Sequence, residues 1–279
     1  GPGEDEYERL SASFDRLDLR SELLSPLPGV STLRLKAAHT RFEQEETEFA
    51  FSRDDGRLED QAVEVAFRNR ESELRLDMVH LPLGGWQGVV GLHWHDRDFA
   101  AFDPEDPDVG FYVRPKRTRS QSLVLLEEYG IGRARLELGA RVERERSRPA
   151  DVVVGDVEGI LLPGGSMLPL PETLPTRRAR SLSLSAGMVG PLAEGHLWRA
   201  SASRSQRTPS PEQLYAFGRH PAAGTFEIGD PHLREETYLH LEAGLEGHHG
   251  RFDYALTLFR TRADDYVFLA TEDDGSGRP

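Results

Sequence analysis

The sequence has no cysteine among its 279 residues, which excludes a disulfide scaffold and a metal site built on thiolates. It also has no apolar run of about 18 residues, the length that a helix needs to cross a bilayer. Basic residues are scarce, because 34 lysines and arginines stand against 48 aspartates and glutamates, a formal net charge of −14. Since no basic stripe offsets these acids, nucleic acid is not an expected partner. The first residues contain no charged segment followed by an apolar core, so no signal peptide is visible.

What the sequence does contain is an alternation of apolar and polar residues with period two. From Arg133 to Glu143, apolar side chains occupy every second position and charged side chains occupy most of the others. The stretch from Leu239 to Glu246 repeats the pattern. Such alternation predicts β-strands with one apolar face. About ten segments show it, near residues 5–24, 31–48, 60–81, 86–100, 116–129, 133–147, 178–190, 196–208, 233–246 and 251–269.

The connections between these segments alternate strictly between short and long. The short ones contain turn-forming proline and glycine: Pro26–Gly29, Pro82–Gly85, Gly130–Gly132, Gly190–Gly195 and Gly247–Gly250. The long polar ones lie near residues 49–59, 101–115, 148–177 and 209–232. An antiparallel meander with tight turns at one end and large loops at the other gives this order, and transmembrane β-barrels have that asymmetry.

A soluble β-sheet protein also alternates, with its charged face in water. Its strands, however, usually have about five or six residues, whereas we expect strands of about fifteen here, enough to cross a bilayer at a tilt. The membrane barrel is therefore the favoured fold class. Aromatic residues near strand ends are placed to form interface girdles: Trp86, Tyr129, Trp198, Phe252, Tyr254, Tyr266 and Phe268.

Ten strands raise the question of closure, because an open sheet edge does not persist in lipid. A closed ten-stranded barrel is possible, but the chain lacks a convincing final strand. The prediction is an all-β protein: a transmembrane antiparallel β-barrel, of which the chain supplies about ten strands of a larger, plugged barrel.

One long connection carries a family resemblance. It runs from Arg207-Thr208-Pro209-Ser210-Pro211-Glu212-Gln213-Leu214-Tyr215 through Gly218-Arg219-His220 to Gly224–Pro231, Leu233 and Glu236. This stretch resembles the late barrel region of TonB-dependent outer-membrane receptors, as does Asp264–Phe268 further on. The Gly-x-His before Thr-Phe-Glu-x-Gly is more similar to the zinc-uptake branch than to the siderophore branches. Shorter motifs upstream resemble the same branch in the same order, so the resemblance covers residues 1–279.

The resemblance implies a receptor rather than an enzyme. Residues 1–279 would be a barrel segment, with the plug domain and the final strands absent, in the outer membrane of a Gram-negative cell. The receptor would import zinc or another transition metal into the periplasm, energised by the TonB complex through the absent plug, and would require no cofactor. Uptake of haem, a siderophore or another metal chelate stays open. Two alternatives from other classes are a passive porin or structural barrel and a soluble carbohydrate-binding β-sheet protein.

His220 is the candidate zinc ligand, because the histidine of the matching Gly-x-His motif is a ligand in the zinc-type receptors. Glu46 is the candidate carboxylate partner, since zinc takes nitrogen and oxygen donors. The corresponding outer-loop stretch of the family reads aromatic-x-His-x-Glu, whereas this sequence has Gln44 in place of the histidine.

Other histidines and the acidic loops have weaker interpretations. His93 and His95, two residues apart, share a strand face and form either a metal pair or a polar pair in a wet lumen, the second being favoured. His248 and His249 fall in a tight turn and are expected to be solvated. Acid-rich loops lie at Asp54–Asp55, Asp103–Asp108 and Glu272–Asp274. Most simply they repel anionic lipopolysaccharide and keep the mouth of the barrel hydrated, and they would also concentrate cations there.

Overall fold

The computed structural model describes residues 4–52, 56–102, 113–149, 160–161, 167–168, 174–220 and 225–270. Ten strands form one antiparallel sheet in the order β1-β2-β3-β4-β5-β6-β9-β10-β13-β14. Their bounds are Glu4–Leu27, Val30–Ser52, Leu58–His80, Trp86–Phe102, Val113–Ile131, Ala134–Pro149, Arg177–Ala193, His196–Arg207, Glu236–His249 and Phe252–Asp264. The predicted all-β class and the ten segments are confirmed. No helix in the described ranges has the length and apolar character to span a membrane.

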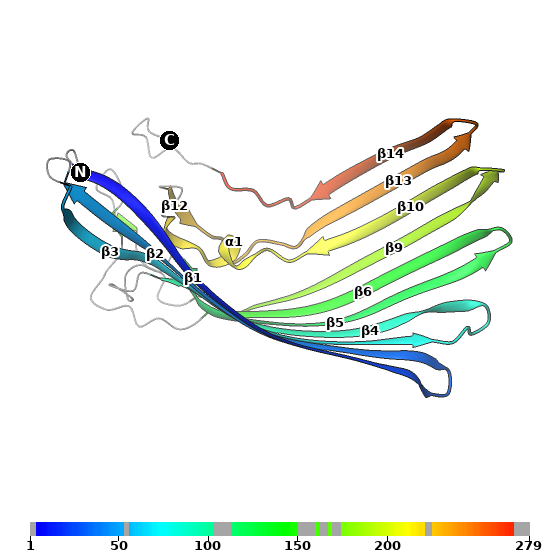
Figure 1. The fold of residues 1–279 in the computed structure, drawn as a ribbon, viewed down its shortest axis with the longest axis horizontal. Coiled ribbons are helices and arrows are strands. Elements are labelled where there is room, and N and C mark those ends of the chain that lie inside the picture. Colours follow the sequence, from blue (N-terminus) through cyan, green and yellow to red (C-terminus); the bar gives the residue numbers. More distant parts are fainter. Residues whose placement is uncertain are drawn as a thin grey trace.

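The sheet is a curved trough whose connections are sorted by length. Figure 1 shows the five short hairpin turns at one end of the sheet. At the other end, β2, β4, β6 and β10 finish and β3, β5, β9 and β13 begin. Five β-hairpins in series produce this sorting, as the alternation of connections predicts. β1 and β14 are the two end strands of the order, so the described sheet is an open segment of a barrel wall.

The first three strands are the longest of the described sheet. β1, β2 and β3 have 24, 23 and 23 residues, against about ten that a tilted strand needs to cross the hydrocarbon core. At about 3.3 Å per residue such strands extend roughly 75 Å. Their loop-end parts therefore rise well above any bilayer that the sheet spans.

One face of the sheet is apolar in continuous rows across neighbouring strands. The register aligns Leu35, Leu76, Leu92, Leu123, Val142 and Leu182 on β2, β3, β4, β5, β6 and β9. Leu92 and Leu123 are 54% and 49% exposed. Uninterrupted rows of exposed aliphatic side chains on one sheet face fit contact with lipid and not with water.

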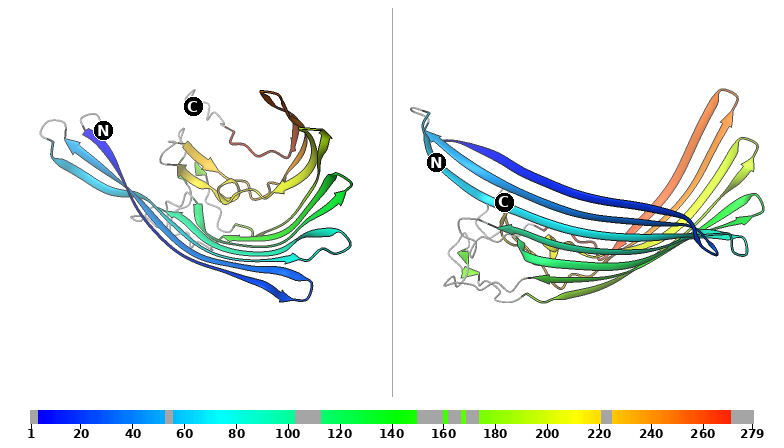
Figure 2. Two further views of the ribbon diagram at one scale, coloured as in Figure 1. Left: turned by 45° about the vertical axis from the view of Figure 1, so that its right-hand side comes forward. Right: turned by 60° about the horizontal axis from the view of Figure 1, so that its bottom comes forward.

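The apolar face is the convex one. Short helix α1, Pro211–Tyr215, and the small β11–β12 sheet, Phe217–His220 and Thr225–Ile228, lie over the concave side of the trough (Figure 2). The Tyr215 ring of α1 covers Lys116 on β5, so Lys116 points inward and its strand neighbours of opposite parity, Leu123 included, point outward. Near the short turns of the same convex face, the rings of Trp86 and Tyr129 are in contact, with centroids 4.9 Å apart, as expected for an interface girdle.

Candidate functional site

The concave wall is polar and is organised in rows that run across the strands. Strand register places four inward-facing side-chain rows across β1 to β5. From the loop end inward, the rows are Phe14, Phe42, Asn69, Phe99 and Lys116; then Arg16, Thr40, Glu71, Arg97 and Thr118; then Asp18, Ala38, Glu73, His95 and Ser120; then Arg20, Lys36, Arg75, His93 and Ser122. An aromatic rim thus lies above a charged wall, which is the character of a wet lumen and not of a dry core.

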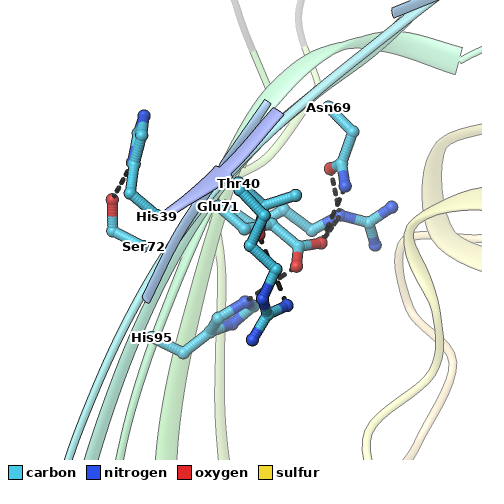
Figure 3. Close-up of polar contacts among 8 residues, drawn as sticks. His39, Thr40, Asn69, Glu71, Ser72 and His95 are labelled. Carbon is cyan, nitrogen blue, oxygen red and sulfur yellow. Dashed lines mark hydrogen bonds and ion pairs between the residues drawn. The ribbon is translucent and has the colours of Figure 1, made fainter. Parts of the chain in front are cut away.

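Glu71 is the centre of a hydrogen-bonded network on this wall (Figure 3). Its carboxylate accepts a hydrogen bond of 2.8 Å from the Asn69 side-chain amide and lies 3.2 Å from Nε of Arg97. That Nε donates to Oδ1 of Asn69 at 2.7 Å, so the three side chains hold one another in place. Nε2 of His95 lies 4.0 Å from Glu71. The arginine is thereby neutralised, and one imidazole is left beside a carboxylate.

The segment between β10 and β13 folds as a small unit against the concave wall. Ser210 begins helix α1 with a capping box, in which its hydroxyl accepts from the Gln213 amide and the Gln213 side chain accepts from the Ser210 amide. This reciprocal bonding satisfies amides that a helix N-terminus otherwise leaves unpaired. Leu214 and Tyr215 are each only 1% exposed. The Pro-Ser-Pro-Glu-Gln-Leu-Tyr motif is therefore a folded anchor and not an open loop.

Three hydrogen bonds fasten this unit to the start of β9 and the residues before it. The Tyr215 hydroxyl donates to the carbonyl of Pro175 at 3.2 Å. Arg177, at the start of β9, donates to the carbonyl of Pro231 at 3.3 Å and to Glu235 at 3.1 Å. Because these partners come from both ends of the segment, the unit is held over the wall as one piece.

Glu236 closes the segment where β13 begins, on the loop side of the apolar band that starts at Leu239. Its side chain is fully buried and is paired with Arg207 of β10. It also accepts from the Tyr238 hydroxyl at 3.0 Å and from the Val267 amide at 2.8 Å. The hydrogen bond from Arg207 lowers the pKa of Glu236 from 4.5 to about 2, because a carboxylate that accepts several hydrogen bonds favours its charged form.

Lys116 is a buried cation under the same unit. Its outward neighbours at this level are Arg117 and Arg119, so it lies above the hydrocarbon layer. It is 2% exposed, and among the described residues Nζ has no hydrogen-bond partner. The ammonium lies 5.7 Å from the Tyr215 ring centroid. Burial lowers the pKa of Lys116 to about 7, and the positive charge of Arg97 lowers it further. The negative charges of Glu212 and Glu145 act in the opposite direction but are weaker than burial.

The structure describes the two predicted metal ligands, His220 and Glu46, to different extents. The backbone of His220 pairs with Thr225 at the end of β11, whereas its side chain lies outside the described part of the structure. Glu46 lies within β2 instead of an outer loop, and its carboxylate accepts a hydrogen bond of 3.1 Å from Gln44. Within the described ranges, no group of three or more histidine, aspartate or glutamate side chains is arranged to hold a metal ion. The zinc assignment stays a prediction.

The other histidines lie close to their expected positions. His93 and His95 both face the concave wall, with ring centroids 6.4 Å apart. His248 and His249 end β13 at a short turn, where His248 pairs with Asp253. Asp54–Asp55, Asp103–Asp108 and Glu272–Asp274 lie outside the described residues. Sequence reasoning missed Glu71, Lys116 and Arg177, because only strand register and folding of the segment bring their partners together.

A sheet with an apolar convex face, a polar concave wall and all large connections at one end is a segment of a transmembrane β-barrel. The family described as "TonB dependent receptor-like, beta-barrel" matches residues 1–279. The chain belongs to this family, whose members are receptors and transporters of the Gram-negative outer membrane rather than enzymes.

Solved structures share the fold at low sequence identity. The copper transporter OprC superimposes with a TM-score of 0.67 at 13% identity, over 92% of this chain and 40% of that one. The hemophore receptor HasR of Serratia marcescens, solved with its hemophore HasA and heme, gives 0.57 at 16%, over 94% and 44%. The ferric-catecholate import receptor Fiu of E. coli K12 gives 0.55 at 14%, over 92% and 41%. The chain thus spans about two fifths of the length of these receptors.

Proposed function

We propose that residues 1–279 are part of the barrel of a complete TonB-dependent receptor that imports zinc or another transition metal across the outer membrane. The rest of that receptor would supply a plug, the remaining strands and the contact with the TonB complex. The observation that carries the proposal is the folded unit between β10 and β13. It displays the Gly-x-His strand β11 over the concave wall, at the loop end where a substrate enters.

Electrostatics support a cationic substrate. The chain has a net charge of −14, and a negative field raises the local concentration of cations near the protein. In the proposal, His220 and Glu46 supply a nitrogen and an oxygen ligand to the incoming ion, a donor set that suits zinc. Residues of the plug would complete the shell.

The test is equilibrium zinc binding to the complete receptor purified in detergent. We expect His220→Ala and Glu46→Gln each to weaken zinc binding about tenfold or more, since lost ligands and their supports cost at least that much. His232→Ala is the matched control, because His232 is an exposed histidine of the same segment to which no ligand role is given. Unchanged zinc affinity in His220→Ala would refute the assignment.

A second candidate substrate is a metal chelate, and the aromatic rim favours it. Phe14, Phe42 and Phe99 lie in one row at the loop end of the concave wall, and Phe14 is 62% exposed. Aromatic faces at a binding mouth suit planar or aromatic ligands. Tighter binding of a ferric catecholate or haem than of free zinc, weakened by Phe14→Ala and indifferent to His220→Ala, would establish this candidate instead.

A further inference from the structure

His93 and His95 lie on the concave wall near the loop-side limit of the apolar convex face. Their strand neighbours Leu92 and Trp94 have the opposite parity and belong to the lipid-facing side, whereas the next outward residue, Asp96, is paired with Arg117 and Arg119. His93 therefore lines the lumen within the membrane span and His95 lies at its upper edge, below the aromatic rim and the Glu71 network. Polar and ionisable side chains are usual on the lumen face of a β-barrel, and those of this wall lie along any path through it.

The two rings are placed for joint binding of one ion. Their centroids are 6.4 Å apart and their planes differ by 27°, so modest rotations about the side-chain torsions bring one nitrogen of each ring towards a common point. Neutral imidazole is a preferred ligand of zinc, copper and nickel. Two carboxylates adjoin the pair: Glu71, 4.0 Å from His95, and Glu73, directly opposite His95 in the register.

The nearby Arg141 and Arg75 disfavour positive charge at His93, but each nearby arginine has a carboxylate partner that offsets part of this opposition. Arg97 is paired with Glu71, and Arg75 with Asp77 at 2.8 Å. Arg141, which faces His93 from β6, is paired with Glu143.

We propose that His93 and His95 form a second, low-affinity position for a divalent transition-metal ion on its way through the lumen. This inference rests on the proposed metal import and adds a step to it, between the mouth and the periplasmic end. In the described ranges no third ligand group is assembled, so the pair holds an ion more weakly than a structural site with a closed shell does. Weak binding suits passage, because an ion in transit must leave as readily as it enters.

The experiment uses Cu²⁺ as the probe on the complete receptor in detergent, because copper binds such donors more tightly than the other divalent first-row ions. Electron paramagnetic resonance reports how many nitrogen atoms coordinate the copper. We expect a copper population with two nitrogen ligands in the wild type and in His220→Ala. This population is lost in the double variant His93→Ala/His95→Ala, with at least a tenfold loss of affinity.

Two further variants make the result decisive. His39→Ala is the matched control, since His39 lies on the neighbouring strand β2 on the opposite face, bonded to Ser72 at 3.0 Å (Figure 3), and its spectrum should equal the wild type. His95→Gln is the fallback if the double variant fails to fold, because it removes one imidazole but keeps a polar side chain. In this variant the copper signal should show one nitrogen ligand. An unchanged two-nitrogen signal in His95→Gln, or none in the wild type, overturns the inference. If instead His220→Ala alone leaves zinc binding untouched, the proposed mouth site fails while the lumen pair stands.

Discussion

Glu236→Gln tests whether the buried charge pair fixes the segment between β10 and β13. The substitution keeps the shape of the side chain and removes its charge, so the contacts with Arg207, Tyr238 and the Val267 amide lose a shared anion. The lowering of the pKa of Glu236 from 4.5 to about 2 corresponds to about 3 kcal/mol in favour of the ionised, folded form. Arg207 is half exposed and regains water when its partner is neutralised, so we expect a loss of about 2 to 3 kcal/mol.

The assay is hydrogen–deuterium exchange of the complete receptor, which reports local opening free energies. Peptides from residues 209–220 and 225–235 should lose protection by about 30-fold to 150-fold in Glu236→Gln. A carboxyl group with a lowered pKa stabilises above its unfolded-state pKa and ceases to do so as the pH falls through the folded-state value. The extra protection of the wild type over Glu236→Gln, corrected for intrinsic exchange, should therefore be complete above pH 4.5 and vanish towards pH 2.

The matched control is Asp264→Asn, which neutralises the exposed Arg262–Asp264 pair of β14, whose side chains are 71% and 53% exposed. An exposed pair contributes about 0 to 1 kcal/mol, so protection of the segment should barely change. A double-mutant cycle with Arg207→Gln isolates the pairwise contribution. Equal losses in Glu236→Gln and Asp264→Asn, or no coupling in the cycle, would refute the reasoning.

Three more predictions concern packing, pH and the lipid face. In Gly229→Ala, the new Cβ would lie 2.7 Å from the backbone carbon of Leu214, so we expect a loss of about 1 to 3 kcal/mol in the same exchange assay. Gly130→Ala, where nothing lies within 4 Å, should be neutral, and equal effects would contradict the packing argument. Because burial lowers the pKa of Lys116 from 10.5 to about 7, packing of the segment should be weakest below pH 7 and strengthen as the pH rises towards 10.5. Lys116→Met should raise protection about tenfold near neutral pH and abolish that pH dependence, and a pH dependence that persists in the variant would disprove its source. Leu92→Arg on the convex face should cost about 2 to 4 kcal/mol of folding free energy in lipid vesicles, whereas Ser201→Arg on the concave face should cost far less, and the reverse order would invert the assignment of the two faces.

The strands and their polarity are determined by local sequence. Alternation from Ala134 to Val142 predicts a two-faced strand, and the structure has β6 there. Turn residues predict the tight end, where Gly29 and Gly132 have φ of 83° and 60°, a region that glycine enters without steric cost. These features depend on side chains a few residues apart, so the sequence suffices for them.

Strand ends were less predictable, because they depend on partners. The expected strand 251–269 stops at Asp264, since Asp265 turns into the left-handed region with φ of 56° and the next amides leave the ladder. The Val267 amide donates to Glu236 instead. On the opposite side of the sheet, β2 extends to Ser52, beyond the predicted end at residue 48, through pairing with β1 and β3.

The sequence by itself determined the class of fold, the ten strands of the main sheet, the end at which the loops gather and, through the motif at 207–236, the family, but not the short strands β11 and β12. Only the tertiary structure decided which side chains meet. Burial of Lys116 beneath Tyr215 joins residues 99 positions apart, and the alignment of Glu71 and Glu73 with Arg97 and His95 requires the register of β3 against β4. Periodicity assigns each residue to a face, but it carries no information on the offset between strands, and that offset is set by the turns and by packing of the whole wall.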